Sequence, residues 1–276
     1  MLSWNLFHGR DSPPAPGLLT WRSRLLRSTE RGATHAQVNR DLHESFAATI
    51  AAAEWDIALL QECPPRWAER LALATDAEAH LVLTSRNLPL LAGLQGRIAD
   101  FSPDLIASWE GGSNLTLVRG PAVGSPAIVE RDQVQIATRP ERRAMALTRL
   151  ASGLCVANVH ASKERTRAEG ELRDCAAAAG GWAAGSPLIL GGDFNLRPAK
   201  SGPLFAELER EHGLARPTSE RAIDHLLVAG AEIVGPPRQW PPERREVPDP
   251  APGDGPILPV RLSDHSPVAA TFALPG

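Results

Sequence analysis

Apolar residues gather in short runs that alternate with polar stretches and with glycine or proline. Runs of this length, bounded by such breakers, are typical of strands. The ranges that fit are 2–7, 57–61, 81–84, 115–118, 144–150, 154–159, 188–191, 223–228 and 268–272. The pattern therefore predicts a chain built largely from short strands.

Two helices are predicted between these strands. Val38, Leu42, Phe46 and Ile50 recur at the fourfold spacing of one helix face. A second helical stretch covers 165–184 and includes a run of alanines. The order strand, helix, strand thus occurs near the start of the chain and again in its middle. Mixed strands with helices over their outer faces predict a layered α/β sandwich.

The segment 235–259 is rich in proline, and we expect a surface insertion without regular strand pairing there. It carries a basic group with one aromatic side chain, a combination that can stack a base and hold a nucleic-acid backbone. These residues are Arg238, Trp240, Arg244 and Arg245. The proline content favours a disordered loop over that role.

Composition limits the choice of class. The chain has 276 residues, of which 43% are hydrophobic, so one large core and a single domain over 1–276 are expected. The net charge of -3 gives no strongly basic field, so bulk electrostatics does not imply tight non-specific binding to nucleic acid, and a local basic groove stays compatible with this charge. The first apolar run is too short for a signal sequence or a membrane span, and we expect a cytoplasmic protein.

The cysteines do not form a framework of their own. Cys63, Cys155 and Cys175 are odd in number and lack metal-type spacing, which fits a reducing compartment and buried, inert thiols. A cysteine hydrolase that uses Cys155 and His160 is disfavoured, because positions five apart on a strand point to opposite faces.

Polar side chains follow several of the predicted strands. They are Asn5, Glu62, Asp193 with Asn195, and Asp264 with His265. Each alone is an ordinary cap or turn residue. Together they place acids at sheet rims, where open α/β folds bind ligands, and oxygen donors are what Mg²⁺ prefers.

The segments that hold these residues resemble, in order and over nearly the whole chain, the motifs of the endonuclease/exonuclease/phosphatase superfamily, which includes DNase I-like nucleases. They read WNLFHG, LLQE, NVHAS, GGDFN, IDHLLV and SDHSPV. The resemblance implies a four-layered α/β sandwich, with two packed central mixed sheets flanked by helices. It also implies a site for Mg²⁺, or for Mn²⁺ in its place, with Asn5, Glu62 and Asp264 on the metal side.

The same resemblance implies the remaining roles. Asp193 and Asn195 would position the attacking water and the phosphate, and His160 and His265 would meet the scissile phosphate from two sides. Asp224 would orient His265. Such a reaction needs a base, stabilisation of the phosphate oxygens and help for the leaving group. The sequence leaves the base open between Asp193 and a histidine.

Supporting residues are less distinct. Arg143 precedes a strand and suits a phosphate contact, or is a solvated surface arginine. Asn114 opens a strand and would donate to a phosphate oxygen, with a turn role as the alternative. His8 follows the first strand in a loop and is left outside the predicted site.

Function is predicted as metal-dependent hydrolysis of a phosphodiester, first as a nuclease on DNA or RNA. The alternative is a phosphatase or phosphodiesterase acting on a small or lipid phosphate. Nuclease members of the family often place a tyrosine near the phosphate, and this chain has none. A non-catalytic scaffold is disfavoured because the acids and histidines are all present. No protein partner is implied, and the oligomeric state, the number of metal ions and the leaving group stay open.

Overall fold

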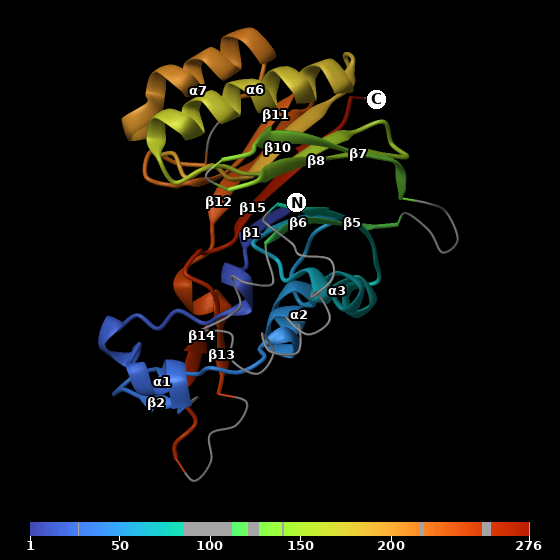
Figure 1. Cartoon of the computed structure of the whole chain (residues 1–276). Coiled ribbons are helices and arrows are strands. Elements are labelled where there is room, and N and C mark those ends of the chain that lie inside the picture. Colours follow the sequence, from blue (N-terminus) through green and yellow to red (C-terminus); the bar gives the residue numbers. More distant parts are fainter. Residues whose placement is uncertain are drawn as a thin grey trace.

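Two β-sheets pack face to face, and helices cover the outer side of each (Figure 1). The computed structural model describes residues 1–26, 28–84, 112–120, 127–139, 141–215, 218–249 and 255–275. The four layers confirm the α/β sandwich that the strand and helix pattern predicts.

The first sheet has six strands in the order β12-β15-β1-β4-β6-β5. Their bounds are β1 (Leu2–Asn5), β4 (Ile57–Gln61), β5 (Ala77–Leu83), β6 (Ser113–Arg119), β12 (Glu232–Gln239) and β15 (Val268–Ala273). Strands β1 and β4 are parallel neighbours, so their carboxyl ends lie at the same edge of the sheet.

The second sheet has five strands in the order β11-β10-β9-β8-β7. Their bounds are β7 (Ile128–Ala137), β8 (Arg143–Leu150), β9 (Cys155–His160), β10 (Leu188–Asp193) and β11 (Asp224–Ala229). Here β9 and β10 are the parallel pair. Each sheet therefore brings two strand ends with polar residues to one edge.

Helices α2 (His43–Ala51) and α3 (Ala68–Thr75) cover the six-stranded sheet, and α6 (Arg165–Ala183) and α7 (Pro198–His212) cover the five-stranded one (Figure 1). The central strands are buried on both faces, which explains their unbroken apolar runs. Leu59 packs between the sheets while its neighbour Leu60 packs towards the helices.

Smaller elements extend one end of the sandwich. Helix α1 (Trp21–Leu26) lies near two short strand pairs, β2 (Glu30–Arg31) with β3 (Ala36–Gln37) and β13 (Glu246–Pro248) with β14 (Pro259–Arg261) (Figure 1). No helix in the described part of the chain is long and apolar enough to span a membrane.

The expectation of no regular pairing across 235–259 is wrong. Strand β12 pairs with β15 as far as Gln239, and β13 pairs with β14. Prolines fit because β12 is an edge strand whose register shifts on both sides of Gly235, where a missing N–H costs no ladder bond. Trp240 and Arg245 are buried, so they are not available for base or backbone contacts. Residues 250–254 lie outside the described part.

Candidate active site

The polar strand ends of both sheets meet at one place. In the first sheet Asn5 lies opposite Gln61, so Glu62 follows directly beside it. In the second sheet Asp193 lies between His160 on one side and Asp224 on the other. The Asn5 amide joins the two sheets by donating to Asp193 Oδ2 at 3.0 Å.

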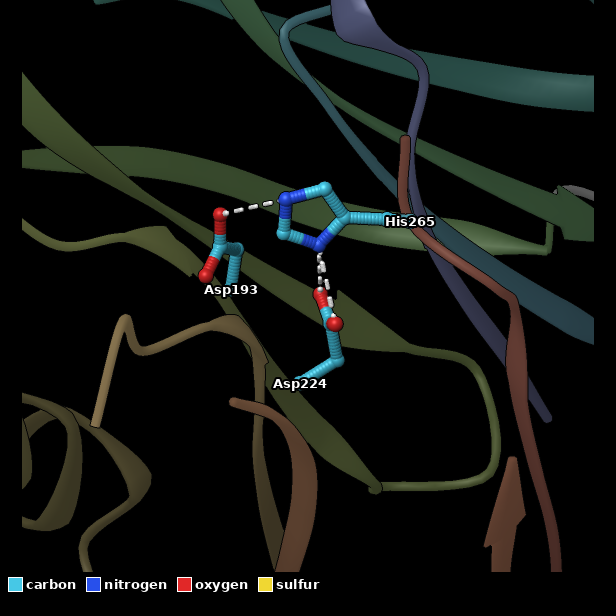
Figure 2. A group of neighbouring side chains, drawn as sticks. All are labelled: Asp193, Asp224 and His265. Carbon is cyan, nitrogen blue, oxygen red and sulfur yellow. Dashed lines mark hydrogen bonds and ion pairs between the residues drawn. The ribbon is translucent and has the colours of Figure 1, made fainter. Parts of the chain in front are cut away.

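His265 lies between two carboxylates (Figure 2). Its Nδ1 is 2.9 and 3.1 Å from the Asp224 oxygens, and its Nε2 is 3.7 Å from Asp193 Oδ2. Burial alone would lower the pKa of His265, but Asp224 and, to a smaller degree, Asp193 raise it to about 10. The ring is therefore cationic at neutral pH.

Asp193 is fully buried and is held from several sides. Asn5 donates to one of its oxygens, and the Asn195 backbone N–H donates to the other at 2.9 Å. Burial and the nearby Asp224 raise the pKa of Asp193 to about 7, against the lowering effect of His265. A carboxylate with a pKa near neutrality exchanges a proton readily under ordinary conditions.

Glu62 and His160 form the other half of the site. His160 Nε2 is 3.7 Å from Glu62 Oε1 and 3.5 Å from Asp193 Oδ2, and it has no hydrogen-bond partner among the described residues. Burial lowers the pKa of His160 to about 3, so this ring is neutral near pH 7. The two site histidines therefore differ in charge.

A second ring faces Glu62 from the other side. His8 Nε2 lies 3.4 Å from Glu62 Oε2, and burial also lowers the pKa of His8. Burial alone would raise the pKa of Glu62, but the surrounding imidazoles bring it down to about 2. Glu62 is thus an ionised carboxylate, with its side chain 13% exposed, that no arginine or lysine of the described residues contacts as an ion pair.

This arrangement fits a divalent cation. An unbalanced buried carboxylate is costly, and Mg²⁺ favours one or two carboxylates supplemented by other oxygens. Asn5 Oδ1 lies at the adjacent strand end and accepts from the Phe7 N–H at 2.9 Å, which fixes the side chain and leaves a second lone pair. The residues present therefore suit Mg²⁺ on the Asn5 and Glu62 side.

The predicted metal acid Asp264 lies further out. Its side chain is 42% exposed, and its nearest recorded contact is 3.8 Å, to His265 Nε2. Among the residues that the structure describes, the group of metal-type ligand atoms within 4.8 Å of one another is instead Asp193, Asp224 and His265. Because Asp224 uses both oxygens on the His265 ring, we interpret that group as an acid–base cluster.

Three predicted contact residues are already engaged. Asn195 donates its side-chain amide to Ala161 O at 3.0 Å. Arg143 donates to His160 O at 3.1 Å and pairs with Glu141 at 3.0 Å. Asn114 is fully buried and donates to backbone carbonyls of β8 and β9. In this arrangement Arg143 and Asn114 support the strand that carries His160.

Sequence reasoning missed the residues that hold the site. Ser263 Oγ donates to Asn5 O at 2.6 Å and accepts from the His265 N–H, which ties the last motif to the first strand. Glu171 on α6 accepts from Ser162 N and Oγ just beyond His160. His8 was left out. For Ser263 the only available signal was its place beside Asp264, and for Glu171 there was none.

The chain belongs to the endonuclease/exonuclease/phosphatase family, whose model matches residues 2–265. Members of this family are hydrolases of phosphate esters. The family resemblance of the motifs is therefore confirmed.

Solved structures share the fold. An endonuclease/exonuclease/phosphatase family protein from Bacteroides thetaiotaomicron has a TM-score of 0.62 at 14% identity, covering 99% of this chain and 94% of that one. A mannosyl-6-phosphatase from the same organism has a TM-score of 0.61 at 14% identity, covering 99% of this chain and 98% of that one. Truncated Caenorhabditis elegans TDP2 has a TM-score of 0.55 at 14% identity, covering 99% of this chain and 96% of that one. No curated protein matches the sequence.

Proposed function

We propose that this chain hydrolyses a phosphodiester with the help of Mg²⁺, and that the catalytic groups are those gathered at the meeting of the two sheets. The observation that carries the proposal is the partly buried, ionised Glu62 beside the Asp193, His265 and Asp224 cluster. One half of this arrangement offers negative charge to a cation, and the other half offers proton transfer.

Asn5 and Glu62 would hold the metal ion, and the exposed Asp264 would reach it only through water or by a change of side-chain position. Mn²⁺ can satisfy the same oxygen donors. When bound, the ion neutralises charge on the phosphate oxygens and orients the ester.

Asp193 would be the general base. Its pKa of about 7 allows it to be ionised at neutral pH and to take a proton from water. His265 is a poor base because its raised pKa keeps it protonated. This difference supports Asp193 where the sequence alone left the choice open.

The histidines would act on the phosphate. Cationic His265 is placed to donate from Nε2 to a phosphate oxygen, and Asp224 keeps the ring oriented and charged. His160 Nε2 is buried without a partner and is suited to hydrogen bond a second phosphate oxygen. Asn195, Arg143 and Asn114 stay secondary candidates, since their side-chain donors are engaged elsewhere.

A nucleic acid is the first substrate class we propose, because the motifs resemble those of DNase I-like nucleases. The second is a small or lipid phosphate. It is favoured by the acidic net charge and by the burial of Arg143 and Arg245, which removes two cations from any backbone-binding track. A phosphatase among the structures of the same fold is compatible with this choice.

A substrate panel with Mg²⁺ and with EDTA tests the proposal. It contains supercoiled plasmid, single-stranded DNA, RNA, bis-p-nitrophenyl phosphate and phosphoinositides. We expect EDTA-sensitive cleavage of a nucleic acid that is lost in Asp193→Ala. Turnover confined to the small or lipid phosphates would move the substrate to the second class. If wild type and Asp193→Ala cleave equally well, the site assignment is wrong.

A further inference from the structure

The loop after β1 has an unusual backbone. Phe7, His8 and Gly9 all have positive φ, at 50°, 53° and 76°. The left-handed region is unfavourable for residues with a Cβ, and runs of it persist only where surrounding structure enforces them. At Gly9 a Cβ would overlap the buried ring of Trp67, so close packing fixes the loop here.

This backbone turns His8 towards Glu62. The His8 N–H donates to Glu62 O at 3.0 Å, and His8 Nε2 lies 3.4 Å from Glu62 Oε2. The other oxygen, Oε1, faces His160 instead. Glu62 itself has a φ of 46°, so both partners in this contact are held in left-handed conformations.

Only one of the two nitrogens of the His8 ring has a polar neighbour among the described residues. Its Nδ1 is buried and meets no partner among the described residues, and its Cε1 packs where Gly112 leaves room. His35 provides the contrast within the same chain. Its Nδ1 contacts Thr34 and its Nε2 contacts Glu246, so both ring nitrogens are satisfied. A buried, unsatisfied nitrogen and a strained backbone indicate a function beyond packing.

We propose that His8 is a positioning residue that holds Glu62 Oε2 through its Nε2 and so presents Oε1 to the metal ion. Carboxylate ligands of metals are commonly fixed by such an outer partner. This inference rests on the proposed metal-dependent function. It adds a third imidazole to the site, on the metal side.

The test is Mn²⁺ binding, measured without substrate by electron paramagnetic resonance. The variants are His8→Asn, whose amide is too short to reach Glu62, and His8→Gln, whose Nε2 extends about as far as the imidazole Nε2. His35→Asn is the matched control for His8→Asn, because it removes another half-buried histidine–glutamate contact away from the site. Unfolding temperatures in EDTA check that the variants fold.

We expect His8→Asn to weaken Mn²⁺ binding about tenfold or more, and His8→Gln and His35→Asn to stay within about threefold of wild type. Excess metal should restore kcat in His8→Asn with KM for substrate unchanged. Excess metal should not rescue Glu62→Ala.

Unchanged Mn²⁺ affinity in His8→Asn would overturn the role of His8 while leaving the proposed function in place. Equal weakening in His8→Asn and His8→Gln would also overturn it, because the Nε2 contact would then not be responsible. If the wild type binds no Mn²⁺, the proposed function and this inference fall together.

Discussion

Asp193 is a residue at which the proposed function and the stability of the fold conflict. It is 1% exposed, and its pKa rises from 3.8 to about 7. In the unfolded chain this acid ionises near pH 4, whereas in the folded chain it ionises near pH 7. The proton on Asp193 therefore stabilises the folded chain fully below about pH 4, and this stabilisation is lost as the pH rises through 7. A neutral amide of the same shape should remove that cost.

We therefore expect Asp193→Asn to be more stable and inactive. At pH 8 its unfolding temperature should rise by about 2–4 °C, since removing the ionisation cost is worth on the order of 1 kcal/mol. Turnover should fall by about 10²–10⁴, the usual contribution of a general base. Thermal unfolding and kcat measure the two effects. Asp174→Asn, at an exposed position on α6, is the control and should change neither. An active Asp193→Asn would contradict the assignment of the base.

In the proposed function, the pair of Asp224 and His265 sets the upper limit of the pH range of activity. The raised pKa of His265 means that the folded chain keeps this proton up to about pH 10, whereas the unfolded chain releases it near 6.5. The stabilisation is therefore complete below about 6.5 and is lost as the pH rises through 10. The proposed reaction needs ionised Asp193 and protonated His265.

The expected kcat/KM profile on a phosphodiester rises through about pH 7 and falls towards about pH 10. In Asp224→Asn the falling limb should move to lower pH, because His265 loses the partner that holds its proton. Bis-p-nitrophenyl phosphate is a suitable substrate, since it does not ionise in this range. A falling limb that stays in place in Asp224→Asn would show that another group controls it.

Much of the site could be predicted from residue types and their order after strands. Asn5, Glu62, His160, Asp193, Asp224 and His265 do come together. The sequence could not show that Asp264 points outward or that the amide of Asn114 is used by neighbouring strands. The sequence does not indicate His8 because its approach to Glu62 depends on positive φ angles at Phe7 and His8. A phenylalanine and a histidine are not residue types that predict such angles.

At the scale of elements, continuous apolar runs were the most reliable signal. The predicted strand at 57–61 matches β4, and the predicted helix at 165–184 matches α6 within a residue. Strand β7 was missed because it is an edge strand with mostly exposed side chains, so burial leaves little pattern. Helix α7 was missed because Pro198, Gly202 and Pro203 resemble a loop.

The two glycines before Asp193 set the geometry of β10. Gly192 has a φ of 136°, and a Cβ there would overlap the carbonyl oxygen of Val159 on the neighbouring strand β9. Because backbone atoms cannot move aside without breaking the ladder, a side chain at this position would displace β10 from β9. His160 and Asp193 sit opposite each other on these strands.

We expect Gly192→Ala to be poorly folded, or to lose most activity when it folds. Gly170→Ala is the matched control, since Gly170 lies inside α6 with nothing within 4 Å of an added Cβ. That control should raise the unfolding temperature by about 1–4 °C, because alanine favours a helix by roughly 0.5–1 kcal/mol over glycine. Soluble yield, circular dichroism and turnover compare the two. A fully active, stable Gly192→Ala would rule out this account of β10.

At the scale of the whole molecule, the site depends on the face-to-face packing of the two sheets, which brings the polar strand ends of both to one place. The residues proposed for the metal side come from the six-stranded sheet, and most of those proposed for acid–base chemistry come from the five-stranded one. Gln61 donates to Asn158 Oδ1 at 2.8 Å across the buried junction, and Asn5 donates to Asp193 near the surface of the site. These buried hydrogen bonds restrict how the sheets can slide, since any shift would leave polar groups unpaired.

Metal binding should therefore raise the unfolding temperature only when both sheets are folded and packed together. A ligand that binds only the folded state stabilises it by about 2.7 kcal/mol at a hundred times its Kd, which is roughly 5–10 °C in a chain of this size. We expect the unfolding temperature to rise with Mg²⁺ concentration and to return on addition of EDTA. Glu62→Ala should abolish the rise.

His265→Ala distinguishes the two halves of the site. This change removes a cation from the acid–base side and leaves Asn5 and Glu62 in place. The unfolding temperature should therefore still rise with Mg²⁺, by the same amount or more, while turnover is lost. If the rise disappears in His265→Ala and persists in Glu62→Ala, the ion binds in the Asp193, Asp224 and His265 cluster. The division of the site between the two sheets would then be the reverse of the one we propose.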